Sequence, residues 1–204
     1  MKKLLAIVFL CAALYGIWWC FFKNKSVSSD DSSKLSAIKS SKHSAAFNLG
    51  INKVVNSYLQ LKSQLVEADS VKGIESGKNF LSILDSLKMD NLKKDTSIYS
   101  TAIAQMGDIK SNAEALVKEP NLTEMREDFK MVTENFYPFL KTISYEGPKL
   151  FLQNCPMAFG EGKDANWISD STERINRLNP YLGKHHPEYH ATMVSCGMVV
   201  DSIE

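Results

Sequence analysis

The sequence lacks an excess of charge of either sign. Its 24 Lys and Arg residues face 23 Asp and Glu residues over 204 positions, which gives a net charge of +1. Without a basic surplus we expect no nucleic-acid partner. The sequence also has no acidic tail that would indicate a cationic partner. Hydrophobic residues make up 44% of the chain, so we expect a packed domain outside any linker.

The sequence also lacks the short motifs of several enzyme classes. It contains no glycine-rich phosphate loop, no HExxH zinc helix, no nucleophile elbow and no CxxC pair. A cysteine with a nearby histidine can form a nucleophile pair, but the sequence shows no third group to orient it. We therefore predict that the protein is not an enzyme.

One long uncharged run is present, from Leu4 to Phe22, with lysines on both sides. As a helix rising about 1.5 Å per residue it would cover about 28 Å, close to the hydrocarbon core of a bilayer. We therefore predict a signal-anchor over residues 1–25 that crosses an inner membrane once through residues 4–22, with the body in the periplasm. Cleavage within the run, which would release a secreted protein, is the alternative.

Serine and lysine dominate residues 26–44, which predicts a flexible linker in which His43 is solvated. Beyond it, the body contains two of the four cysteines, Cys155 and Cys196. In an exported body these thiols can oxidise, and two is the number that can form one bridge.

Four amphipathic stripes lie within residues 45–147 and predict a mainly α fold, a four-helix up-down bundle. Ser70 and Asn121 are the expected N-caps of the second and fourth helices, and Pro138 is expected to kink the fourth. Glycines in the second helix weaken it or let a neighbour approach closely. The stripes are Phe47, Ile51, Val54, Val55, Tyr58, Leu61 and Leu65; Ile74, Leu81, Leu84 and Leu87; Ile98, Ala102, Met106, Ile109, Ala113 and Leu116; and Met125, Phe129, Val132, Phe136, Leu140 and Ile143.

Residues 148–204 have a different texture, with short apolar segments at 150–155 and 198–200 separated by loops. They predict a lobe of short β-strands and loops that is too small to fold alone and therefore packs on the bundle. Trp167 is the expected packing anchor of this lobe, and the stretches around it, FGEGKDANWISDS and RLNPYLGKHHPEYH, are expected to be loops.

The lobe repeats one short pattern, because Cys155-Pro156-Met157 and Cys196-Gly197-Met198 are both Cys-x-Met. On extended backbone the first and third residues share a face, so two such segments side by side would bring thiols and thioethers together. These ligands select Cu(I), whereas zinc would need more Cys and His. Pro187 can start a helical turn with His186 at its cap. The candidate ligands are Cys155, Met157, Met193, Cys196 and Met198, with His186 or His190 as an addition.

Two other interpretations of these residues stay open. Cys and Met are often buried as plain core residues, and HHPEYH is compatible with a solvated loop. A Cys155–Cys196 disulfide would close a loop of ~42 residues, which is worth roughly 4 kcal/mol by the chain-entropy estimate.

As a set, NCPMAF, ANWISDS, RLNPYLGK and MVSCG resemble a bacterial family of exported proteins known as domain of unknown function 3347. The resemblance extends over about residues 45–204 and relates the chain to modules of heavy-metal efflux adaptors. The insertion HHPEYHAT between the last two motifs departs from the family pattern. The matching positions are Cys155, Pro156, Met157, Trp167, Asn179, Pro180, Tyr181, Met193, Cys196 and Gly197.

The resemblance implies a role with copper or another soft metal. We therefore expect a membrane-anchored periplasmic protein that binds Cu(I) for sequestration or for transfer to heavy-metal efflux components. The alternative is a structural or interaction module in which Cys155 and Cys196 form a disulfide and no metal binds.

Overall fold

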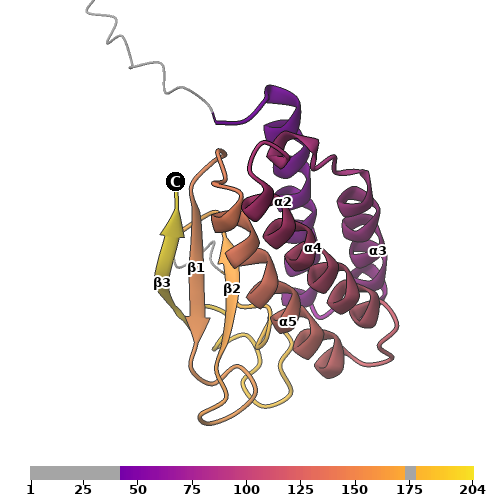
Figure 1. Ribbon diagram of the computed structural model, residues 1–204. Coiled ribbons are helices and arrows are strands. Elements are labelled where there is room, and N and C mark those ends of the chain that lie inside the picture. Colours follow the sequence, from indigo (N-terminus) through magenta and orange to yellow (C-terminus); the bar gives the residue numbers. More distant parts are fainter. Residues whose placement is uncertain (1–41, 173–177) are drawn as a thin grey trace, which may run out of the picture. The chain divides into compact units, whose positions relative to one another are not determined.

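The computed structural model describes residues 42–172 and 178–204 (Figure 1). The predicted anchor over residues 1–25 and most of the predicted linker lie outside the described residues. All described residues belong to one compact unit. Among them, no helix combines the length and the apolar character that a membrane span requires.

Four α-helices form the larger part of the described structure, as the sequence predicts. They are α2 (Ala45–Val66), α3 (Ser70–Ser86), α4 (Thr96–Leu116) and α5 (Leu122–Thr142), and the short 3-10 helix η1 (Asp90–Leu92) lies between α3 and α4. Consecutive helices pack on one another along the chain, α2 on α3, α3 on α4 and α4 on α5. The mainly helical fold is therefore confirmed, and the up-down arrangement of the helices stays a prediction.

A side-chain oxygen caps the start of each of these four α-helices by accepting a hydrogen bond from the backbone N–H three positions later. The cap of α5 is Asn121, as predicted. The predicted cap Ser70 is wrong, because the Asp69 carboxylate accepts from the N–H of Lys72 at 2.9 Å and Ser70 is already helical. The remaining caps are Ser44 for α2 and Asp95 for α4. Helix α5 continues through Pro138 to Thr142, and the kink at Pro138 stays a prediction.

His43 is not a solvated linker residue. It is half-buried: its Nε2 lies 2.5 Å from the carbonyl oxygen of Ile143, its Nδ1 lies 2.8 Å from Nδ2 of Asn91, and its ring contacts Phe47. An Nε2–H tautomer suits both partners, because Nε2 then donates to the carbonyl and Nδ1 accepts from the amide. The packed structure therefore includes residues that precede α2.

The predicted stripes of α2, α4 and α5 face the core, but α3 uses a different face. Gly73, Gly77, Phe80 and Leu84 are its buried residues, whereas Ile74, Leu81 and Leu87 are only partly buried. The reason is close packing, since a Cβ on Gly77 would lie 2.6 Å from Cγ1 of Val117. The two glycines let α3 approach its neighbours closely, as the sequence suggested.

Replacement of Gly77 with alanine is expected to lower the free energy of unfolding by about 1 to 3 kcal/mol, because the new methyl group overpacks against Val117. Gly107 in α4 is the matched control, since a Cβ there would meet nothing within 4 Å. Gly107→Ala should raise stability by up to about 1 kcal/mol through helix propensity. Urea unfolding measures both changes, and a stabilising Gly77→Ala would contradict the close packing.

A three-stranded antiparallel sheet in the order β2-β1-β3 follows the helices. Its strands are β1 (Leu150–Cys155), β2 (Ala165–Ser169) and β3 (Met198–Ile203). The sequence predicts β1 and the first half of β3, but its prediction of a loop at 165–169 is wrong. These residues pair with β1 in the register Phe151↔Ser169 to Cys155↔Ala165, and most of their side chains are buried. The strand β2 lies against α5 (Figure 1).

Tyr58 of α2 joins the helices to the sheet. Its hydroxyl lies 2.6 Å from the hydroxyl of Thr133 in α5 and accepts a hydrogen bond from the backbone N–H of Ile168 in β2 at 3.1 Å. The ring stacks on Phe129 and contacts Phe136. Complete burial raises the pKa of Tyr58 well above its usual range, so the hydroxyl stays protonated as a hydrogen-bonding group.

Candidate functional site

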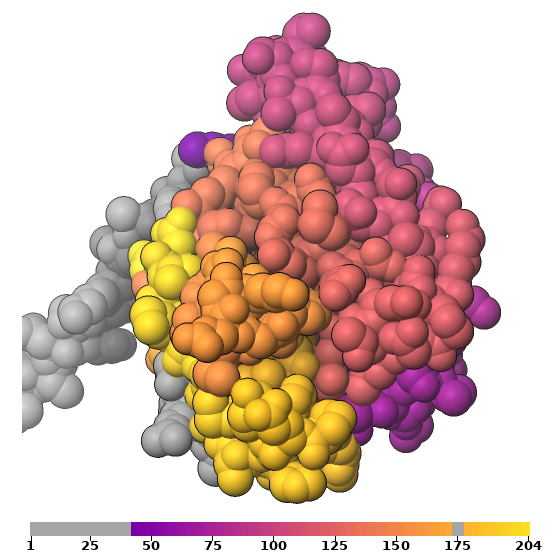
Figure 2. Space-filling view, turned by 90° about the horizontal axis from the view of Figure 1, so that it is seen from below, coloured from indigo at the N-terminus to yellow at the C-terminus, as the bar shows by residue number. Residues whose placement is uncertain are grey.

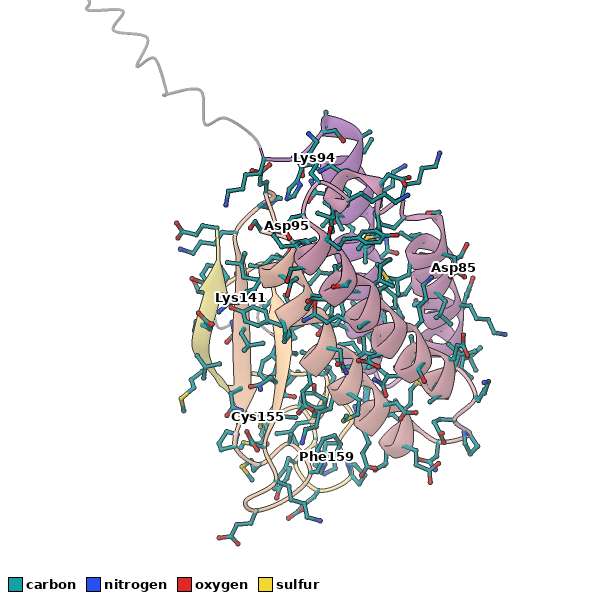
Figure 3. The ribbon with its side chains drawn as sticks, in the orientation of Figure 1. Asp85, Lys94, Asp95, Lys141, Cys155 and Phe159 are labelled. Atoms are coloured by element: carbon teal, nitrogen blue, oxygen red, sulfur yellow. The ribbon has the colours of Figure 1, made fainter. Side chains whose placement is uncertain are left out.

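The two body cysteines meet at one end of the sheet. Cys155 is the last residue of β1, and Cys196 stands two residues before β3, which pairs with β1 through Asn154↔Met198. Their Sγ atoms are 3.4 Å apart as thiols. Cys155 is buried and Cys196 is partly exposed. Figure 3 shows Cys155 at the lower end of β1, and Figure 2 looks onto this end of the molecule.

Trp167 and Gly197 determine the path of the chain beside the thiols. Gly197 has φ +136°, a conformation that side chains disfavour. A Cβ at this position would lie 2.4 Å from Cη2 of the buried Trp167 and 3.0 Å from the carbonyl oxygen of Asn154. The chain therefore passes over the indole ring at a distance that only glycine allows.

Asn179 holds the backbone of Cys196 in place. The amide Nδ2 of Asn179 donates to the carbonyl oxygen of Cys196 at 3.1 Å, and its Oδ1 accepts from the N–H groups of Tyr181 and Leu182 at 2.8 and 3.2 Å. Its own N–H donates to the carbonyl of Val194 at 2.7 Å. This fully buried side chain thus ties the N-P-Y turn to the segment that carries Cys196.

Tyr181 extends this support to β2. Its hydroxyl donates to the carbonyl oxygen of Asn166, and its ring packs edge-on against Trp167 and contacts Phe129 of α5. Burial raises the pKa of Tyr181 well above its usual range. The Cys, Trp, N-P-Y and Cys-Gly motifs, which are far apart in the sequence, therefore form one connected structure around the two thiols.

The predicted geometry of the two Cys-x-Met segments is wrong. Met157 lies in the turn after β1, and the φ of Gly197 interrupts the extended backbone between Cys196 and Met198. Met157 and Met193 are partly buried and pack against the core, whereas Met198 is 57% exposed. Met193 also accepts a hydrogen bond from the N–H of Cys196 through its backbone carbonyl at 2.9 Å. The ligand role of these thioethers stays a prediction.

The histidine segment forms a turn of its own. Nδ1 of His186 accepts from the N–H groups of Glu188 and Tyr189, each at 3.2 Å, so His186 caps the turn that Pro187 begins. Burial and then the charge of Arg126 lower the pKa of His186, which favours the neutral ring. Within the described ranges, no three His, Cys, Asp or Glu residues are grouped to hold a metal ion. Among the described residues, the structure therefore brings the two thiols together, and neither His186 nor His190 joins them in a three-residue metal-binding group.

Arg126 supports the site and was not anticipated from the sequence. It is buried in α5, where its Nη2 donates to the carbonyl of Leu65 at 2.9 Å and lies against Gly183, four residues after Asn179. Burial lowers its pKa to about 10. The guanidinium cation pairs with a backbone carbonyl in the last turn of α2, where the helix dipole favours positive charge. The only sequence signal is its place beside the stripe residue Met125, which is too weak to identify it.

The fold and the site define a class of protein: a helical domain with a small C-terminal antiparallel sheet that holds two adjacent thiols. Within that class, residues 54–146 match the model of a family described as Protein of unknown function (DUF3347). The match runs from the middle of α2 to just beyond α5 and supports the resemblance to that family. It ends before β1, so the Cys, Trp and N-P-Y motifs lie outside it. The chain matches neither a curated protein nor a solved structure.

Proposed function

We propose that the protein binds a soft metal ion, Cu(I), through the thiols of Cys155 and Cys196. The sulfur-sulfur distance of 3.4 Å carries this proposal, because two cysteines 41 positions apart have been brought next to each other. Thiolate ligands select Cu(I), and binding would release the thiol protons. The partial exposure of Cys196 gives the ion a way in and out.

The donor set favours Cu(I) over zinc. Structural zinc sites in proteins close a tetrahedron of four Cys or His ligands. Across residues 42–172 and 178–204, the two thiols have no further His, Cys, Asp or Glu grouped with them into such a site. Met157 and Met193, close in sequence to Cys155 and Cys196, would supply thioethers, which are soft donors that suit Cu(I).

The proposed role is sequestration of Cu(I) or its transfer to a heavy-metal efflux component. In this proposal residues 4–22 anchor the chain in an inner membrane and the body lies in the periplasm. The alternative is a structural module closed by a Cys155–Cys196 disulfide, which the same 3.4 Å distance also favours. The two functions differ in the mass of the native protein.

The deciding experiment is the native mass of the full-length protein, produced in an oxidising bacterial compartment supplied with copper. We expect a species about one copper heavier than the chain, with Cys155 and Cys196 still open to alkylation after unfolding. Cys155→Ala and Cys196→Ala should each abolish the copper adduct. A metal-free species two hydrogens lighter that still gains no copper after reduction and addition of Cu(I) would overturn the metal proposal and favour the disulfide module.

The thioethers are tested by volume-conserving substitutions. Met157→Leu and Met193→Leu should each cost less than about 1.5 kcal/mol of stability, because leucine keeps the packing. Because each substitution removes a thioether ligand, it should nevertheless weaken Cu(I) affinity at least about tenfold, a loss of about 1.4 kcal/mol of binding free energy. Met106→Leu, in the buried face of α4, is the matched control and should leave the affinity unchanged. Competition with a Cu(I) chelator measures all three, and unchanged affinity in the first two would remove the thioethers from the site.

A further inference from the structure

The two thiols differ in access. Cys196 is partly exposed, whereas the side chain of Cys155 is fully buried behind it at the end of β1. A dissolved molecule therefore reaches Cys196 first. Reactivity of a thiol depends on such access, and a second thiol within reach can complete the exchange that the first one starts.

The contacts that hold the site together do not need a bond between the sulfurs. Asn179 fixes the carbonyl of Cys196, the carbonyl of Met193 accepts from its N–H, and Trp167 lies under Gly197. Cys155 is fixed independently by the pairing of β1 with β2 and β3. The open dithiol is therefore a complete packed state, and a small side-chain movement from 3.4 Å brings the sulfurs to bonding distance.

We propose that Cys196 and Cys155 form a reversible thiol–disulfide couple that exchanges with small disulfides such as glutathione disulfide. The Cys196 thiolate attacks one sulfur of the small disulfide, forms a mixed disulfide and releases one small thiolate. The Cys155 thiolate then attacks the sulfur of Cys196, forms the Cys155–Cys196 bond and releases the second small thiolate. The protein loses two electrons and two protons, and the small disulfide becomes two thiols.

The couple adds regulation to the metal site, and this part of the inference rests on the proposed function. Oxidation converts both sulfurs from thiolate donors into a disulfide, which removes the two ligands that the structure places together. Bound Cu(I) in turn occupies both thiols and protects them from exchange. The exchange itself needs no metal, so it can be tested without copper.

The test uses the full-length chain with Cys11→Ala and Cys20→Ala, so that only the two body thiols report. The protein is equilibrated with glutathione and glutathione disulfide at varied ratios, with a copper chelator present, then quenched with acid and weighed. We expect conversion from the dithiol to a species two hydrogens lighter as the proportion of glutathione disulfide rises, and full return to the dithiol as that proportion falls. A protein that stays reduced, or stays oxidised, at every ratio would overturn the reversible couple.

Two single variants in the same background test the order of attack. Cys155→Ala should stop at a glutathione adduct on Cys196, and Cys196→Ala should form its adduct on Cys155 at least about tenfold more slowly because that thiol is buried. Circular dichroism shows whether both variants fold. If either does not, timed alkylation of the unsubstituted pair followed by peptide mapping gives the same order, with Cys196 labelled first. Equal rates at the two cysteines would overturn the assigned roles.

Copper binding and exchange fail separately in these experiments. Loss of the copper adduct with intact exchange would remove the proposed metal function and leave the redox couple. A copper adduct without exchange would remove the redox couple and leave the proposed metal function.

Discussion

Replacement of Gly197 with alanine is expected to lower the free energy of unfolding by about 2 to 6 kcal/mol. Two costs add at this position. A non-glycine residue at φ +136° stores about 1 to 3 kcal/mol of backbone strain. The new methyl group also overpacks against Trp167 at 2.4 Å and the carbonyl of Asn154 at 3.0 Å, which costs about a further 1 to 3 kcal/mol.

Gly160 provides the control for Gly197. It too has a positive φ, +106°, but a Cβ there would meet nothing within 4 Å. Gly160→Ala should therefore show the strain alone, about 1 to 3 kcal/mol. Urea unfolding followed by circular dichroism measures both variants. Equal losses in the two would show that contact with Trp167 contributes nothing, contrary to the packing described above.

Substitution of Asn179 by alanine is expected to cost about 3 to 5 kcal/mol. The buried N–H groups of Tyr181 and Leu182 lose their acceptor, at a cost of about 1 to 3 kcal/mol each, and the carbonyl of Cys196 loses the hydrogen bond from Asn179. Partial relaxation of the turn keeps the total below the sum. Because Asn179 fixes the Cys196 backbone, the variant should also expose the thiols to faster alkylation.

Asn112→Ala is the matched control, since the amide of this partly exposed residue donates a solvent-exposed hydrogen bond to the carbonyl of Asp108 within α4. It should change stability by less than about 0.5 kcal/mol and leave thiol alkylation as it is. The measurements are urea unfolding and the rate of alkylation under native conditions. An Asn179→Ala protein with normal stability and a normal alkylation rate would contradict the positioning role.

Local pattern determined the parts of the fold that the sequence predicts well. Helices α2, α4 and α5 carry apolar residues at helical spacing, and β1 begins with the apolar run Leu150-Phe151-Leu152, so the local sequence pattern located all four elements. Helix α3 was located but its face was misjudged, because its buried surface includes Gly73 and Gly77, which carry no hydrophobic signal. Strand β2 was missed because Ala165, Asn166 and Ser169 are weak strand formers.

Long-range contacts account for what the sequence could not supply at the site. The approach of Cys155 and Cys196 was anticipated because both flank apolar segments that pair in a sheet. Hydrogen bonds across many residues were not, such as that from Asn179 to Cys196 or from Ile168 to Tyr58. Such bonds leave no periodic signature. The histidine segment is a local feature by contrast, and the sequence predicts its turn: His186 caps the turn that Pro187 begins.

The contacts just before α2 have a mechanical consequence. The N–H of Lys42 donates to Glu146, His43 contacts the carbonyl of Ile143, and the N–H of Ser44 donates to Asn91. Tension on the preceding chain would reach these three contacts, just after α5 and at η1, before it reached α2. The dithiol lies at the far end of the sheet from this attachment (Figure 3). A pull on the N-terminal side would therefore act first on these contacts, away from the two sulfurs.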